Sequence, residues 1–188
     1  MLPDPGDRTP APDALRPIQA FVNTLDIENG IEELDSPAAL AGALERAGLT
    51  EPGLRPTEAD LRAALDVREA LRALLLANNG VAHEAGALVP LERAARAGQL
   101  AARVSSGGDL ALVAEAPGVD GALGRLVALV LTAGADGSLA RLKACRRDVC
   151  HWVFYDRSRN RSSHWCSMLV CGNRTKAARY RRAHAPAA

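Results

Sequence analysis

All four cysteines of the 188-residue chain lie in its last quarter. They form two pairs of equal spacing, Cys145 with Cys150 and, after fifteen intervening residues, Cys166 with Cys171. Two short-range thiol pairs separated by a hairpin-length insert are the usual ligand pattern of a tetrahedral zinc site. A segment this small cannot bury enough apolar surface to fold without a metal or a disulfide. The spacing therefore predicts a structural Zn²⁺ ion held by four thiolates.

Three alternatives stay open: two disulfides, free thiols, or a site in which His151 or His164 replaces a cysteine. Disulfides need an oxidising compartment. The N-terminal stretch MLPDPGDRTPAPDALRP has neither a basic region nor an apolar region of the kind that directs secretion. We therefore expect a cytoplasmic protein, in which a metal is favoured over disulfides.

Helix geometry constrains the second pair. Residues five apart on a helix are separated by about 140° around its axis, so Cys166 and Cys171 cannot both face one metal from a straight helix. One of them must lie in a turn before the helix or at its first residues, and Ser167 is suited to cap that helix. With a knuckle at the first pair, a strand over 151–156 and a turn over 156–163, the order is that of a treble-clef zinc module.

The charge is strongly segregated along the chain. Residues 141–184 contain twelve Lys and Arg and two acidic residues, whereas the remaining chain contains eleven and twenty. A basic cluster on a metal-pinned scaffold indicates phosphate binding, although such runs also serve as solvated faces. Ala177, Tyr180 and His184 would form the packing face of a C-terminal helix. The candidate DNA contacts are Arg157, Arg159 and Arg161, on one side of the chain if it is extended there, and Arg174, Lys176, Arg179, Arg181 and Arg182 on the helix.

RNA is a variant of this hypothesis. Trp152 or Tyr155, if exposed, would suit stacking on unpaired bases, but we favour a role for these aromatics in the small core of the module.

The C-terminal stretch resembles the CGNR zinc-finger family, named for the tetrapeptide that stands here at 171–174. The resemblance implies that the four cysteines are zinc ligands and that the arginines contact DNA in a bacterial transcription regulator. Family members usually carry a basic residue just before the tryptophan, where this chain has Ser163 and His164. The other matching residues are Phe154, Asp156, Ser158, Arg159, Asn160, Arg161, Trp165, Cys166, Ser167, Met168 and Lys176.

The remaining chain is predicted to be α+β with helices dominating. Residues 1–15 are Pro-rich and are expected to be disordered, 16–136 to form the main domain, and 137–188 the zinc module. Apolar periodicity and capping residues predict helices from Pro17 to Leu25, after Ser36, after Thr57 to Asn78, over 90–97, and over 120–132. The stretch 21–25 (FVNTL) is also compatible with a strand. Two apolar stretches around Gly107-Gly108 predict a β-hairpin.

This part of the chain resembles the ABATE domain, the partner of the CGNR finger. The residues that carry the resemblance are the segments 21–24 (FVNT) and 67–71 (VREAL). It implies a ligand-sensing domain with a small-molecule effector, for which Asn23 and Arg68 are the candidate pocket residues. The alternatives are a turn-forming Asn23 and a surface ion pair for Arg68.

No catalytic constellation is present in the sequence. The segment beginning His83-Glu84 lacks the second histidine of a zinc protease, and there is no Gly-rich phosphate loop. No apolar run reaches the roughly 20 residues that span a bilayer, so we expect neither an enzyme nor a membrane protein. The leading hypothesis is a DNA-binding regulator. The second is a module that docks on acidic protein surfaces, including those of another copy in a homodimer.

Overall fold

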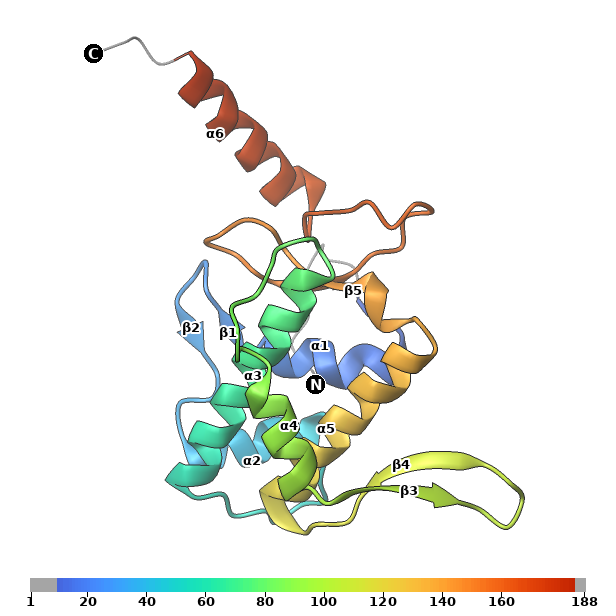
Figure 1. Ribbon diagram of the computed structural model, residues 1–188. Helices are drawn as coiled ribbons and strands as arrows, with labels where there is room; N and C mark the ends of the chain where they lie inside the picture. The colour runs from blue at the N-terminus through green and yellow to red at the C-terminus, as the bar shows by residue number, and fades with distance from the viewer. Residues whose placement is uncertain (1–9, 185–188) are drawn as a thin grey trace.

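The structure is a computed structural model that describes residues 10–184 (Figure 1). It is mostly helical with three two-stranded antiparallel sheets in that range, which confirms the predicted α+β class. The elements are η1 Asp13–Leu15, α1 Arg16–Val22, β1 Leu25–Asp26, β2 Ile31–Glu32, α2 Pro37–Arg46, α3 Glu58–Ala77, α4 Val89–Ala97, β3 Leu100–Val104, β4 Leu110–Ala114, α5 Gly118–Ala135, η2 Leu139–Arg141, β5 Leu142–Ala144, β6 Val153–Tyr155, the π-helical turn η3 Met168–Gly172 and α6 Asn173–Ala183.

The predicted helix starts are confirmed by their caps. Ser36 Oγ accepts a hydrogen bond from the Ala39 amide at 3.2 Å, and α2 begins at the next residue, a proline. At α3, Thr57 and Asp60 form a reciprocal capping box, with distances of 3.2 Å and 2.7 Å between the two amides and the side-chain oxygens. These caps satisfy amides that have no partner within the helix.

Helix α1 is shorter than predicted. It ends at Val22 and not at Leu25, because the chain turns at Asn23 into the short β1–β2 hairpin. Leu25 pairs with Glu32 and Asp26 with Ile31. This hairpin carries acidic side chains next to the C-terminal module.

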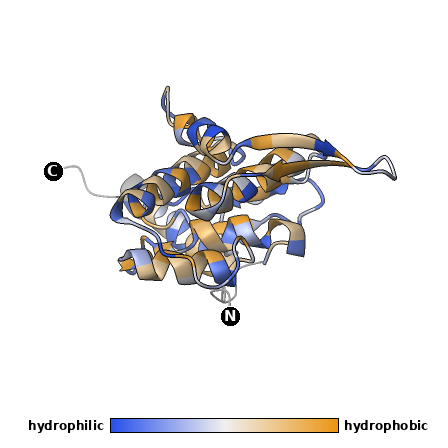
Figure 2. Cartoon of the chain, turned by 90° about the horizontal axis from the view of Figure 1, so that it is seen from below, coloured by the Kyte–Doolittle hydropathy of each residue, from blue (hydrophilic) through white to orange (hydrophobic). Residues whose placement is uncertain are grey.

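One apolar core joins the two predicted domains. Figure 2 shows apolar residues along the inner faces of the packed helices. Ile18 of α1, Leu71 of α3 and Leu126 of α5 are completely buried. The strands β5 and β6, which we assigned to the zinc module, contribute Leu142 and Val153 to this same core, also without exposure. The chain does turn at the predicted boundary after α5, yet the core continues across it.

Part of the segment predicted to be disordered is ordered. Residues 1–9 lie outside the described residues, but Ala11 and Leu15 are 1% and 2% exposed and belong to the core. The amide of Ala11 donates to Gln19 Oε1 at 2.7 Å. The proline-rich composition was misleading because a few apolar residues within it find a buried place against α1.

The β3–β4 hairpin is confirmed and projects from the body (Figure 1). Its register runs from Leu100 opposite Ala114 to Val104 opposite Leu110. Val104 and Leu110, at its outer end, are 67% and 80% exposed.

Helix α5 is long and apolar enough to cross a membrane by length and composition. However, 56% of it is buried inside the protein, as expected for the central helix of a folded core. Gly121 and Gly124 on this helix are buried, which lets neighbouring chain segments approach closely.

Candidate zinc centre and its basic surroundings

The four cysteines converge on one buried point. Cys145 follows β5, Cys150 closes the knuckle before β6, Cys166 precedes η3, and Cys171 lies within η3. Their four Sγ atoms lie within 4.8 Å of one another, and all four residues are buried. The Sγ of Cys166 is 3.7 Å from that of Cys150 and 3.6 Å from that of Cys171.

These distances fit a zinc ion. Four sulfurs placed tetrahedrally at a Zn–S distance of about 2.3 Å are separated by about 3.8 Å. A disulfide requires about 2.05 Å between the sulfurs. The cysteines are free and spaced as zinc ligands, so the disulfide alternative is not supported. A structural Zn²⁺ held by the four thiolates is the cofactor of this site.

The electrostatics of the thiols also favour a bound cation. Hydrogen bonds from Cys150 and Cys166 lower the pKa of Cys145 to about 4, so one thiolate forms readily. That same contact with Cys145 raises the pKa of Cys150, and the pKa of Cys166 is raised above its ordinary range by both neighbours. A buried cluster with one thiolate resists further deprotonation, and a divalent metal ion supplies the charge that stabilises all four.

Local structure explains how the second pair reaches the metal. The Ser167 Oγ caps the turn by accepting from the Val170 amide at 3.3 Å, as predicted. The turn itself is a π-helix, with the Gly172 amide donating to the Ser167 carbonyl at 3.1 Å. Cys166 therefore lies before the helix and Cys171 within its first turn, which is the arrangement that helix geometry demanded.

Neither histidine belongs to the cluster. Among the described residues, the group that could hold a metal ion contains the four cysteines and no histidine. His164 Nδ1 lies 2.7 Å from Asn79 Oδ1, which fixes its ring against the end of α3. Burial lowers the pKa of both His151 and His164, and nearby arginine charges lower it further.

The loop after β6 is a compact turn, as predicted for 156–163, so the extended arrangement that would align Arg157, Arg159 and Arg161 does not occur. Asp156 organises this loop. Its carboxylate accepts from the Ser158 and Ser163 amides at 2.9 and 3.0 Å and from Lys143 Nζ at 2.7 Å. Asp156 and Lys143 are both buried, so these bonds and not the arginine spacing determine the path of the chain.

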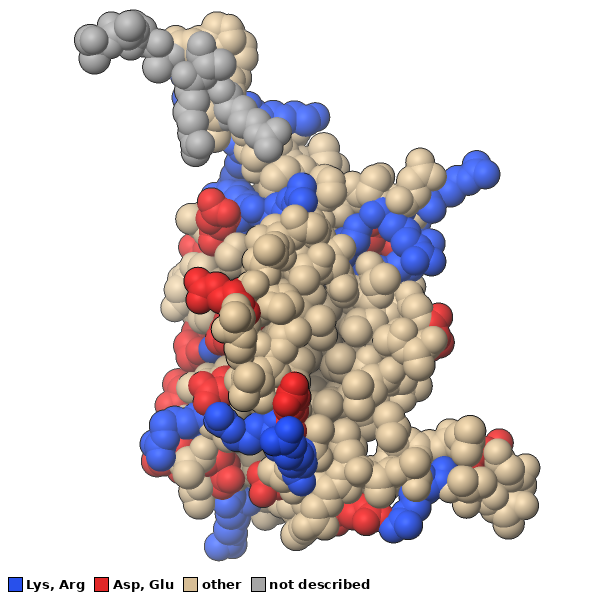
Figure 3. All heavy atoms as spheres, viewed as in Figure 1, with Lys and Arg blue, Asp and Glu red and all other residues tan. Residues whose placement is uncertain are grey.

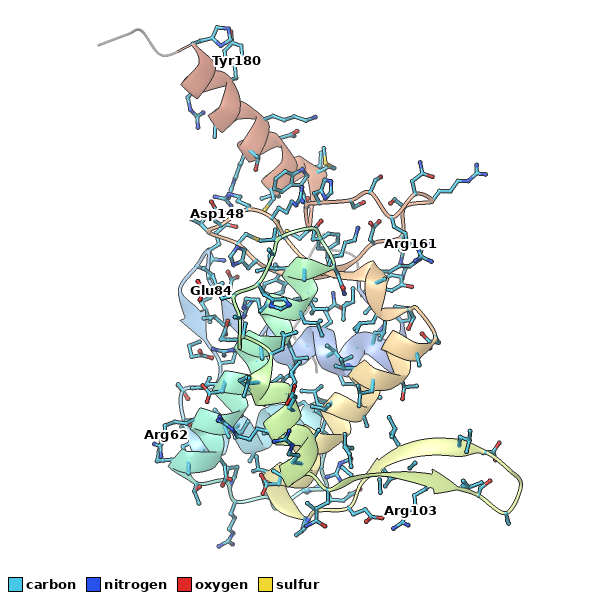
Figure 4. All side chains as sticks on the ribbon, in the orientation of Figure 1. Arg62, Glu84, Arg103, Asp148, Arg161 and Tyr180 are labelled. Carbon is cyan, nitrogen blue, oxygen red and sulfur yellow. The ribbon has the colours of Figure 1, made fainter. Side chains whose placement is uncertain are left out.

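The three loop arginines are exposed, as are Arg174, Lys176 and Arg181 on α6. Figure 3 shows basic side chains around the base of α6 and on the loop, with a further basic group at the opposite end of the molecule. The loop at Arg161 and the outer end of α6 at Tyr180 lie well apart (Figure 4), so the candidates form two patches. The side chains of Arg179 and Arg182 lie outside the described residues.

The predicted packing face of α6 is not buried. Tyr180 is 65% exposed, and Ala177 and His184 are exposed as well. The rings of Tyr180 and His184 stack on each other, with 4.1 Å between their centroids. The helix projects outward from the zinc centre (Figure 1), so its apolar stripe faces solvent.

Trp152 and Tyr155 pack in the interior of the protein, as we expected, and are not placed to stack on bases. Trp152 is 7% exposed and packs with Phe154 and the cysteines in a second small core, while Tyr155 packs against the main core. They are therefore not arranged as stacking platforms for RNA bases.

Asn23 and Arg68 serve as internal polar connections. The Asn23 side chain exchanges hydrogen bonds of 3.0 and 2.8 Å with the main chain of Val153 in β6. Arg68, 4% exposed, makes a bidentate pair with Glu32 at 2.6 and 2.8 Å and a further bond of 2.8 Å with Glu69. The polar groups proposed for an effector pocket are thus engaged with the protein itself.

The residues that fasten the zinc module to the helices were mostly missed. Asn79 Nδ2 donates to the carbonyls of Ala144 and His164 at 2.8 and 3.0 Å. Arg72 donates to the His151 carbonyl at 3.1 Å. The sequence predicts only the end of a helix at Asn78 and gives no role to the next residue. A pair of polar residues at the end of an apolar helix is the one sequence feature that indicates a bonding role for Asn79, and it is a weak one.

Two more missed residues are charged. Glu28, on the β1–β2 hairpin, accepts from Arg147 at 2.7 Å and from Arg174 of the CGNR tetrapeptide. Arg147 Nη1 also lies 4.0 Å from Cys171 Sγ. No pattern in the sequence connects Glu28 with a residue 146 positions further on.

The fold and the site define a zinc-finger protein, in which a four-cysteine centre is built onto the core of a helical domain. Residues 15–144 match the ABATE family model, described as "Putative stress-induced transcription regulator", and residues 141–184 match the CGNR zinc finger. Because the first match covers more than half of the chain, the protein belongs to the ABATE family. The two matches occur in the predicted order. A search of curated proteins returned no match.

Proposed function

We propose that the protein is a cytoplasmic, non-enzymatic transcription regulator that binds DNA through its C-terminal module, a treble-clef finger. The observation that carries this proposal is α6, an exposed basic helix that projects from a zinc-pinned base (Figure 1). Eleven residues of helix extend about 16 Å. A projecting helix of this kind fits the major groove of B-DNA, about 12 Å wide.

The tetrapeptide supports this role by fixing where α6 begins. A side chain at Gly172 would meet Met168 Sδ at 2.8 Å and Trp165 Cδ1 at 3.3 Å, so glycine permits close packing at the base of the helix. Asn173 starts α6 and Arg174 follows with its side chain 55% exposed. Arg174, Lys176 and Arg181 would contact phosphates and guanine edges, with Arg157, Arg159 and Arg161 as a second contact patch.

The test is a salt titration of DNA binding by the full-length zinc-loaded protein. With about five phosphates neutralised, the logarithm of the affinity should fall against log salt with a slope near −4 to −5. The double variant Arg174→Gln/Arg181→Gln should weaken binding and make the slope shallower by about two. The matched control Arg62→Gln/Arg96→Gln removes two charges from α3 and α4 and should change neither quantity.

An affinity and a slope that are both unchanged in the α6 variant would remove this helix as the contact surface. The corresponding double variant Arg157→Gln/Arg161→Gln then tests the loop patch separately. Equal losses from both pairs would mean that the two patches bind one duplex together.

A second candidate function, protein assembly, is favoured by the projecting β3–β4 hairpin. Val104 and Leu110 expose apolar surface on a two-stranded sheet whose outer edges pair with no other strand among the described residues, which suits association with a second copy. Light scattering separates the mechanisms. Association through acidic and basic patches should be lost at high salt, whereas association through the hairpin should persist and be lost in Val104→Thr/Leu110→Thr.

Ligand sensing by the N-terminal domain is also part of the proposal. Asn23, which bonds to Val153 of the zinc module, would then transmit an effector's presence. Arg68 would act through Glu69 and Arg72, because Arg72 donates to the His151 carbonyl. We assign no catalytic step to the metal, because four thiolates complete its tetrahedral coordination.

A further inference from the structure

A pocket lies between the zinc knuckle and α6. It has a volume of about 440 Å³, within the range of small-molecule sites. One wall is formed by the knuckle and the other by the first turns of α6. Its lining residues are Val81, Arg146, Arg147, Asp148, Val149, Trp165, Arg174, Thr175 and Ala178.

Three arginines and one acidic residue, Asp148, line this pocket. The side chain of Arg146 donates from Nη2 to the Gly80 carbonyl at 3.0 Å. Its Nε is buried and has no hydrogen-bond partner among the described residues. A buried donor without an acceptor is unfavourable. An anionic ligand oxygen would satisfy it once a movement of the Arg146 side chain turned Nε towards the pocket.

The other two arginines already converge on an anionic oxygen. Oε1 of Glu28 accepts from both Arg147 and Arg174, although these residues come from the knuckle and from α6. Glu28 is mostly buried, with its side chain 17% exposed, and it is not among the lining residues. Its carboxylate indicates how two guanidinium groups would hold an oxygen of a bound anion.

We propose that this pocket is a phosphate-binding site, in which Arg146, Arg147 and Arg174 hold the phosphate and Glu28 competes with it. The planar fork of arginine matches the geometry of phosphate oxygens. A tethered carboxylate carries one negative charge, so a phosphate group with nearly two displaces it more readily than a monocarboxylate does. Val81, Val149 and Trp165 leave room for a small apolar group beside the phosphate.

Such a group can come from a free phosphorylated molecule or from a nucleic-acid backbone. Arg174 on α6 belongs both to this pocket and to the proposed DNA contacts. Arg146 and Arg147 lie in the knuckle and are not among the proposed DNA contacts, so their variants test the pocket separately from DNA binding. The two sources are distinguished by competition.

The experiment is isothermal titration calorimetry of the full-length zinc-loaded protein with phenyl phosphate and with inorganic phosphate. We expect saturable binding of one phosphate per chain, with the phenyl ester binding more tightly. Arg146→Gln should weaken binding about tenfold or more, since a charged hydrogen bond is lost. Glu28→Gln should tighten binding, and Arg96→Gln, on the distant α4, should leave it unchanged.

The Glu28 variant keeps the proposal falsifiable, because misfolding cannot produce tighter binding. Arg146→Lys provides a second variant that retains the charge without the fork and should also bind more weakly. Zinc content is measured for each variant. Absence of saturable binding, or equal affinity in wild type, Arg146→Gln and Glu28→Gln, would overturn the proposal.

A DNA arm completes the test. Displacement of a labelled duplex by phenyl phosphate would identify the backbone as the source, and independent binding would identify a free phosphorylated ligand. DNA binding that persists while phosphate binding is absent would overturn this site but not the proposed function. Phosphate binding without DNA binding would support this site and overturn the proposed function.

Discussion

The side-chain amide of Asn23 pairs with the main chain of Val153 as a neighbouring strand would. Its Nδ2 donates to the Val153 carbonyl at 3.0 Å, and its Oδ1 accepts from the Val153 amide at 2.8 Å. The two residues are 130 positions apart and both are buried. Strand β6 thus has β5 on one edge and an asparagine of the helical domain on the other. The zinc module is therefore fastened to the domain by hydrogen bonds from a side chain to the main chain in a buried interface.

Replacing Asn23 with alanine should destabilise the protein by about 1–3 kcal/mol, because the buried Val153 amide loses its acceptor. The Val153 carbonyl keeps a second donor, Gln19 Nε2 at 3.1 Å, which limits the loss. Urea unfolding of the zinc-loaded protein measures the change. The control is Asn29→Ala on the β1–β2 hairpin, where the side chain bonds to Asp26 at the surface. A loss from Asn23→Ala no larger than from the control would contradict the fastening role.

The sequence was most informative where one local rule decides the structure. The caps at Ser36 and Thr57 follow from a side-chain oxygen next to free amides, and the zinc site follows from the spacing of four thiols. The turn before Cys171 follows from the helix period. Each of these needs only residues that are close in the chain.

It was least informative where distant residues decide. Asn79, Glu28 and Arg72 bond to partners 65 to 146 positions away along the chain. The residues next to them in the sequence form no pattern that predicts these bonds. The composition of 156–163 predicts the turn that is observed, but the spacing of the loop arginines does not place them, because the buried carboxylate of Asp156 bends the segment. The stripe on α6 was expected to be buried, but no described element lies over it.

Removing the zinc should lower the stability of the whole chain and not only of its C-terminal end. Leu142 and Val153 belong to the main core, and the strands that carry them are joined by the knuckle between Cys145 and Cys150. Chelation under reducing conditions should therefore lower the melting temperature measured from helix content by circular dichroism. Cys171→Ser should behave like the chelated protein. An unchanged helix melting curve after loss of zinc would show that the core does not depend on the metal.

The crossing of α4 and α5 should not accept an added methyl group at Gly98. A Cβ placed there would lie 2.6 Å from Gly124 Cα and 2.9 Å from the Asp120 carbonyl oxygen, which are backbone atoms that cannot rotate away. Gly98→Ala should destabilise the protein by about 1–3 kcal/mol through overpacking.

The control for that crossing is Gly134→Ala, near the end of α5. A Cβ there has one neighbour, Leu139 Cδ2, at 4.0 Å. This substitution should be neutral or stabilise the helix by up to about 1 kcal/mol. Thermal unfolding of both variants checks the pair. A stable Gly98→Ala protein would mean that the two helices can separate at this point without cost.

The buried pair of Lys143 and Asp156 should give stability a specific dependence on pH. Burial raises the pKa of the Asp156 carboxyl, but hydrogen bonds from Lys143, Ser158 and Ser163 outweigh it and hold the pKa well below its ordinary range. A depressed pKa in the folded state stabilises the protein above the unfolded value, about 3.9. This contribution is lost as the pH falls below about 4 towards the folded value.

Asp156→Asn should therefore cost about 3–5 kcal/mol at neutral pH, because it leaves the Lys143 charge buried without its partner. The difference from wild type should be constant at neutral pH and shrink as the pH falls below about 4, where the wild-type carboxyl is protonated as well. Urea unfolding at several pH values with excess zinc measures it, and Asp13→Asn, whose side chain is 97% exposed, is the control. Because both proteins lose thiolate ligands in acid to the same extent, the difference between them isolates the carboxylate. A difference that stays constant down to pH values well below 4 would contradict the assignment of this stability to the Asp156 charge.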